Sequence, residues 1–102
     1  MNWRDLWTDN AILGVREVGK FINEHQPGRG AVVVDAIFDR VAEVLGFPEA
    51  APVHPTAGDP RVRRLVFRKY VIIYRILEER RIVEVLSVRH QRQRPVEPDE
   101  LP

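Results

Sequence analysis

The chain has 102 residues, of which 44% are hydrophobic and 30% are charged. This length and composition predict one compact domain and exclude wholesale disorder or two full-sized domains. The absence of cysteine excludes disulfides and thiolate chemistry. No apolar run is long enough to cross a bilayer, and the first residues lack the pattern of a secretory signal. We therefore expect a cytoplasmic protein with no membrane partner.

The charges are unevenly distributed along the chain, although the net charge is only +1. Residues 1–60 hold five Lys or Arg and nine Asp or Glu, whereas residues 61–94 hold eleven and three. Residues 95–102 add three acids and three prolines, which predicts a mobile tail after a single domain over residues 1–94. The basic second half indicates either a partner-binding surface or strands that carry arginine on a solvated face.

The first half of the chain predicts a strand and two helices. Residues 3–7 are mostly apolar and suit a strand, and Thr8 or Asp9 can cap the helix that follows. Apolar side chains then recur at spacings of three and four, which predicts a helix to about His25. After a Pro-Gly break, the same spacing predicts a second helix over residues 31–45. The short link between them predicts an antiparallel helical hairpin.

The second half of the chain predicts a loop and three strands. Residues 46–60 hold four prolines and two glycines, so we expect a surface loop in which His54 is solvated. Val62–Phe67, Tyr70–Leu77 and Arg81–Val88 are rich in β-branched and aromatic residues, which is typical of strands. The predicted order is β-α-α-β-β-β, an α+β domain with a helical hairpin packed on a mostly antiparallel sheet.

The strands predict a sheet with two different faces if Phe67 pairs with Tyr70. One face is apolar and aromatic and should cover the helices. The other carries arginines among aliphatic residues and would suit an apolar and acidic partner. The first face comprises Leu65, Phe67, Tyr70, Ile72, Tyr74 and Ile76. The second comprises Arg64, Val66, Val71, Ile73 and Arg75.

Four strings in this order resemble the RelE/ParE superfamily of bacterial toxins. They are Trp7-Thr8-Asp9-Asn10-Ala11, Phe47-Pro48-Glu49, Arg63-Arg64-Leu65 with the run from Tyr70 to Arg75, and the run from Ser87 to Gln93. The resemblance implies a type II toxin of a plasmid-stabilisation module. A cognate antitoxin would neutralise it by direct binding in a toxin–antitoxin hetero-oligomer. RelE-like members cut mRNA on the ribosome, whereas ParE-like members inhibit DNA gyrase and have no known hydrolytic site.

Compared position by position, most of the RelE nuclease set is missing. RelE-like toxins have an arginine directly after the tyrosine that matches Tyr70, and this chain has Val71. They have another arginine four residues after the serine that matches Ser87, and this chain has Gln91. Arg64 keeps a basic residue where RelE has a lysine. The resemblance therefore implies a ParE-like gyrase inhibitor with no catalytic residue.

Two alternatives stay open. A metal-independent ribonuclease would use His90 as general acid or base with Arg64 and Arg92 on the phosphate, although a histidine at a strand end is more often exposed. The other alternative is that the chain binds its antitoxin but has lost toxicity. We expect no metal or cofactor, because His25, His54 and His90 lack ligand spacing. The candidate target- or antitoxin-binding residues are Arg63, Arg64, Arg75, Arg89, His90, Arg92 and Arg94.

Overall fold

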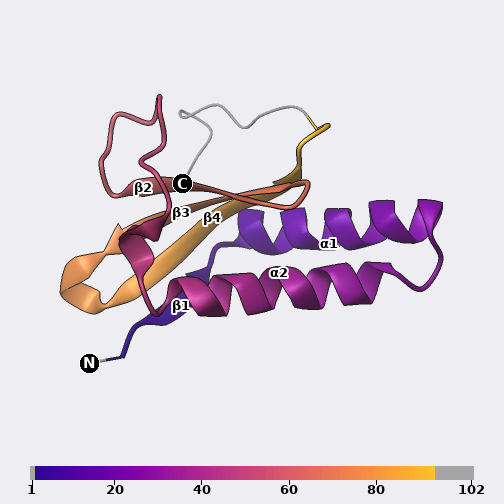
Figure 1. Cartoon of the computed structure of the whole chain (residues 1–102), viewed down its shortest axis with the longest axis horizontal. Coiled ribbons are helices and arrows are strands. Elements are labelled where there is room, and N and C mark those ends of the chain that lie inside the picture. The colour runs from indigo at the N-terminus through magenta and orange to yellow at the C-terminus, as the bar shows by residue number, and fades with distance from the viewer. Residues whose placement is uncertain (1, 94–102) are drawn as a thin grey trace.

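Two antiparallel helices cover one face of a four-stranded sheet in the computed structural model, which describes residues 2–93 (Figure 1). The elements are β1 (Arg4–Trp7), α1 (Asp9–His25), α2 (Gly30–Val44), β2 (Val62–Phe67), β3 (Tyr70–Leu77) and β4 (Ile82–His90). Two short 3-10 helices, η1 (Pro48–Ala50) and η2 (Glu78–Arg80), lie in the connections. The predicted order and fold class are confirmed. Arg94 and the predicted tail over residues 95–102 lie outside the described residues.

The helical hairpin forms as its apolar spacing predicts. Thr8 caps α1, since its Oγ1 accepts a hydrogen bond from the backbone N–H of Ala11 at 3.1 Å. Each helix buries one stripe of small aliphatic residues against the sheet. The stripes are Ala11, Val15 and Val18 on α1, and Val33, Ile37, Val41 and Val44 on α2. Within the described residues, neither helix is both long and apolar enough to cross a membrane.

The strand order across the sheet is β1-β4-β3-β2. β1 runs parallel to β4, and the other two pairs are antiparallel, with Phe67 opposite Tyr70 as predicted. The face that carries Leu65, Ile72 and Tyr74 packs on the helices and forms the main core. The predicted assignment of the core face is therefore confirmed.

The opposite face of the sheet is less open than the sequence predicts. Val62, Val71, Ile73 and Leu86 form a second buried cluster, against which Ala57 packs. The loop after α2 returns along β2 and places Ala57 there, as an isolated bridge joins residue 53 to residue 63. Most of the aliphatic part of this face is thus core, and its arginines and Val66, 45% exposed, remain for a partner.

His54 is buried, and the expectation of a solvated loop histidine was wrong. Its side chain and backbone are 9% exposed. Its N–H donates to the carbonyl of Val62 at 2.8 Å, and its Nδ1 accepts from the N–H of Thr56 at 3.2 Å. Burial, and then the charge of Arg64, lower the pKa of this imidazole. The loop packs on the sheet edge through tertiary contacts that its composition did not reveal.

Candidate functional site

β4 contains one extra residue that reverses the direction of its side chains. Tyr74 lies opposite Val85, but the preceding residue Ile73 lies opposite Ser87. Leu86 is therefore a β-bulge, which shifts the alternation of β4 by one residue. This single residue decides which side chains at the end of β4 face the helices.

The bulge separates Arg89 from His90. His90 lies opposite Tyr70, on the face that packs on the helices, and Arg89 lies opposite Val71 on the other face. Without the extra residue, Arg89 would lie opposite Tyr70 and His90 would point away from the helices. The basic end of β4 thus supplies two different surfaces.

The start of α1 holds the bulge in place. The side-chain amide of Asn10 donates to the carbonyl of Leu86 at 2.9 Å. The hydroxyl of Thr8 also reaches the carbonyls of Val85 and Leu86, at 3.1 and 3.3 Å. A buried carbonyl released from a strand ladder needs such donors. The Thr8-to-Asn10 string therefore has a structural role at the bulge.

Three arginines lie on the face away from the helices, one on each of three neighbouring strands. We call Arg64 of β2, Arg75 of β3 and Arg89 of β4 the arginine face. Arg75 Nη1 donates to Glu84 Oε1 at 2.8 Å. Arg64 and Arg89 form no ion pair with a described residue, and the Nε of Arg89 is buried without a hydrogen-bond partner among them. Burial, and then the charge of Arg64, lower the pKa of Arg89. This face suits an acidic group.

A basic hollow opens on the helix side, where the helical hairpin meets the β2–β3 turn. It measures about 370 Å³. We call it the histidine pocket and define it by His25, Arg29, Arg68, Lys69, Tyr70, His90 and Arg92. Lys69 is fixed beside the end of β4, because its carbonyl accepts from the N–H of Gln91 at 2.8 Å. The pocket thus combines residues from three separate segments.

His90 forms the floor of this pocket and is only 7% exposed, so the expectation of an exposed strand-end histidine was wrong. Its ring lies 5.5 Å from the rings of both Phe21 and Tyr70. Its Nδ1 accepts from the N–H of Arg92 at 3.0 Å. Burial lowers the pKa of His90, and the charges of Arg92 and Lys69 lower it further. The bulge explains this burial, since it turns the ring toward the helices.

The residues considered for a ribonuclease are not brought together. Arg92 lies beside His90, but Arg64 lies on the opposite face of the sheet. An acid–base group and a phosphate clamp must reach the same phosphate to cooperate. His90 and Arg64 therefore cannot act together on one phosphate in this arrangement.

Arg89 Nη1 donates to the carbonyls of His90 and Gln93, at 3.3 and 3.5 Å. Arg63 is also engaged within the fold. Its Nη1 donates to the carbonyls of Glu49 and Ala51, at 3.1 and 3.0 Å, and so fastens the loop after α2. Arg94 lies outside the described residues. Within residues 2–93, no three His, Asp or Glu side chains are grouped to hold a metal ion.

Five residues of the histidine pocket were missed by the sequence analysis. The sequence placed Arg68 and Lys69 between two predicted strands, Arg29 between two predicted helices, and His25 at the end of the first helix. Tyr70 was assigned to the core. The predicted Phe67–Tyr70 turn did place two cations at one end of the sheet. The missing signal was that the helical hairpin ends at the same place.

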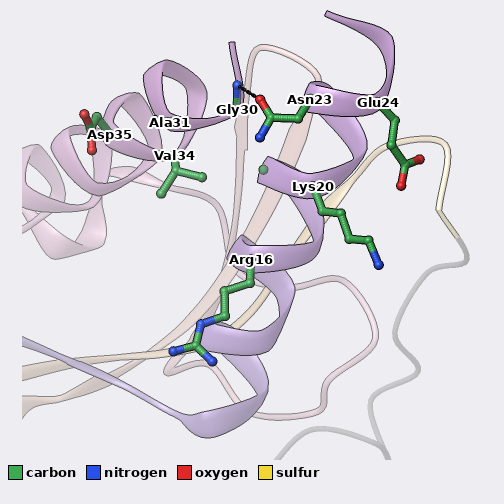
Figure 2. A pocket seen from close by; sticks show the side chains of 9 residues that line it. Arg16, Lys20, Asn23, Glu24, Gly30, Ala31, Val34 and Asp35 are labelled. Carbon is green, nitrogen blue, oxygen red and sulfur yellow. Dashed lines mark hydrogen bonds between the residues drawn. The ribbon is translucent and has the colours of Figure 1, made fainter. Parts of the chain in front are cut away.

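A second hollow, of about 610 Å³, lies on the outer side of the helical hairpin (Figure 2). Gly19 and Gly30 line it, and α1 and α2 approach so closely there that a Cβ at Gly30 would overlap the carbonyl oxygen of Gly19. Figure 2 shows the hydrogen bond from the N–H of Gly30 to Asn23 Oδ1, which measures 2.8 Å. Arg16 and Lys20 line it together with acidic residues of both helices, so its charge is mixed. This hollow has no clear preference for a charged ligand.

Solved structures of similar fold are bacterial toxins. The chain superposes on a protein of the chromosomal ParDE toxin–antitoxin system of P. aeruginosa with a TM-score of 0.71 and 16% identity, covering 88% of this chain and 96% of that chain. A mutant of E. coli RelE in the free state superposes with a TM-score of 0.66 and 22% identity, covering 90% of this chain and 86% of that chain. A chain of the RelBE2 toxin–antitoxin complex of Mycobacterium tuberculosis superposes with a TM-score of 0.62 and 20% identity, covering 88% of this chain and 99% of that chain. The fold is that of the RelE/ParE superfamily.

The sequence itself matches one family within this superfamily. Residues 6–95 match the ParE toxin of the type II toxin–antitoxin system parDE. Among curated proteins no sequence match is found. Because the match spans most of the chain, this protein belongs to the ParE toxin family and is a type II toxin of the RelE/ParE superfamily.

Proposed function

We propose that this chain is a ParE-like toxin that inhibits DNA gyrase and does not cleave mRNA. The observation that carries the proposal is the environment of Val71, which occupies the position of a nuclease arginine in RelE-like toxins. Val71 is 1% exposed and belongs to the apolar cluster with Ile73 and Leu86. A charged group at this point would need a partner or solvent that the cluster does not offer. The position of one nuclease arginine of RelE-like toxins is therefore apolar here.

The arginine face is the surface that we assign to gyrase. Arg64 and Arg89 have no carboxylate partner among the described residues, and they flank the apolar cluster on the strands either side of β3. Arginines without a carboxylate partner can form charge-assisted hydrogen bonds with an acidic surface. Such contacts would give both affinity and orientation.

A cognate antitoxin is the second partner that we propose. Solved relatives of similar fold include the intact E. coli RelBE toxin–antitoxin complex, at 22% identity. Here β2 is an edge strand of the sheet. Near its C-terminal end, Val66 is 45% exposed, and it lines one groove together with Phe47, which is 66% exposed. An extended antitoxin segment could pair with this edge and cover both side chains. Co-expression of the antitoxin should restore growth and yield a complex in which Val66→Lys weakens binding.

One experiment separates gyrase inhibition from the ribonuclease alternative. The chain is induced alone, and plasmid topology and mRNA integrity are measured in the same culture. The proposal predicts growth arrest with relaxed or cleaved plasmid and intact transcripts. Cut transcripts with normal plasmid topology would establish the ribonuclease instead. Unchanged growth would support the reading in which antitoxin binding is kept and toxicity is lost.

A further inference from the structure

The histidine pocket concentrates positive charge without a carboxylate to neutralise it. Arg29, Arg68, Lys69 and Arg92 line the pocket, and no Asp or Glu of the described chain lines it with them. None of these four cations forms an ion pair with a described residue. Like charges gathered around one hollow repel one another, and a bound anion relieves that repulsion.

The backbone of the β2–β3 turn fixes the position of two of these cations. Arg68 adopts a left-handed conformation with φ 55°, which an arginine occupies at a cost that glycine would avoid. Its guanidinium lies 4.9 Å from the ring centroid of Phe67. A two-residue β-hairpin turn needs such a positive φ, so this conformation sets the position of Arg68 and Lys69 at the end of the sheet.

Two buried side chains present polar atoms to the same hollow. Tyr70 is 6% exposed and His90 7% exposed, and both line the pocket. The hydroxyl of Tyr70 and the Nε2 of His90 make no hydrogen bond with a described residue, although Nδ1 of His90 accepts from Arg92. Because Nδ1 accepts, the neutral His90 ring carries its proton on Nε2 and offers a donor there. The hydroxyl of Tyr70 is a second donor. The floor therefore offers two donors beneath a rim of cations.

An aromatic surface lies beside these donors. Phe21 is 38% exposed, and its ring lies 4.5 Å from the ring of His25 and 5.5 Å from that of His90. A positively charged groove next to exposed rings is the usual arrangement for binding single-stranded nucleic acid, since cations follow the phosphates and bases stack on the rings.

We propose that the histidine pocket binds a phosphate group of a single-stranded nucleic acid, with the adjacent base stacked on Phe21 and His25. The phosphate oxygens accept hydrogen bonds from Tyr70 and His90, and the rim cations neutralise their charge. This site lies on the opposite side of the sheet from the arginine face. It is independent of gyrase inhibition, and either proposal can fail without the other.

A histidine-detected NMR titration of the full chain tests the site directly. Inorganic phosphate, thymidine 5′-monophosphate and a short oligothymidylate are added in turn, and the imidazole signals of His90 and His54 are followed. We expect saturable shifts of His90 with all three, with the oligothymidylate binding at least about tenfold more tightly than phosphate. His54 lies on β2's outer edge and is the internal control, so its signals should not move. Absence of a saturable His90 shift would overturn the site.

Charge variants then separate a specific pocket from general attraction. Lys69→Gln and Arg29→Gln should each weaken oligothymidylate binding by about tenfold. Each should also reduce the magnitude of the slope of log K against log salt concentration by about 0.7. Arg80→Gln removes the same charge from the exposed turn η2 at the other end of the β3–β4 hairpin, and should change affinity less than twofold. Equal losses in all three variants would show attraction to net charge alone. An oligothymidylate that binds no more tightly than phosphate would refute the nucleic-acid ligand.

Discussion

Arg89 and His90 are neighbours in sequence but belong to surfaces on opposite sides of the sheet. Arg89 joins a flat arginine face on three strands, and His90 lies at the bottom of a pocket formed by three segment ends. The difference depends on Leu86, the extra residue in β4. A run of basic residues at a strand end therefore does not define one site, because a single bulge can divide it between two.

The largest expected effect concerns the contact between α1 and β4. A Cβ at Gly14 would overlap the carbonyl oxygen of Val88, and its nearest neighbours are all backbone atoms of that residue. Gly14→Ala must therefore displace α1 from β4, and we expect a loss of about 3 kcal/mol in the free energy of unfolding. Urea unfolding measures it.

Gly46→Ala is the matched control for this substitution. A Cβ at Gly46 would approach the carbonyl of Glu43 no closer than 3.4 Å, which is ordinary contact. We expect a change within about 0.5 kcal/mol. Equal stability of the Gly14→Ala protein and the wild type would show that the two elements are not packed as described.

The next largest effect separates the two surfaces by function. Arg64→Gln with Arg89→Gln removes both unpaired cations of the arginine face, and we expect gyrase inhibition to weaken by about 30-fold. Lys69→Gln removes a cation from the histidine pocket and should leave inhibition within about twofold. A supercoiling titration measures both. If the pocket variant lost more inhibition than the arginine-face variant, the assignment of gyrase to the arginine face would be wrong.

A smaller effect concerns the donor that holds the bulge. Asn10→Ala removes the 2.9 Å hydrogen bond to the carbonyl of Leu86 and leaves that group dependent on the hydroxyl of Thr8. We expect a loss of about 1 kcal/mol in the free energy of unfolding. Asn2→Ala, at an exposed position before β1, is the control and should have no measurable effect. A neutral Asn10→Ala would mean that the bulge does not need this donor.

The sequence predicted the elements, their order and the core face, because each depends on local periodicity. The helix stripe from Ala11 to Ile22 and the pairing of Phe67 with Tyr70 are of this kind. The bulge at Leu86 could not be predicted, since its signals are hydrogen bonds from Thr8 and Asn10, more than seventy residues earlier. The histidine pocket also depends on tertiary contacts between distant turns.

The smallest effect is the dependence of stability on pH. Burial is the main cause that lowers the folded-state pKa of His90 and His54 below the ordinary 6.5. As the pH falls through about 6.5, the unfolded chain takes up protons before the folded chain does, so stability falls. Urea unfolding between about pH 8 and pH 5, above the range of most carboxylates, measures this loss. His90→Asn should reduce it, and an increase in stability on acidification would contradict the described burial.

The most direct test of the central claim is a gyrase supercoiling assay with the purified wild-type protein. If this chain inhibits gyrase, supercoiling decreases as the toxin is added and is restored by the cognate antitoxin. The same preparation should leave ribosome-bound mRNA intact. Normal supercoiling at a large excess of folded toxin would show that this chain does not inhibit gyrase.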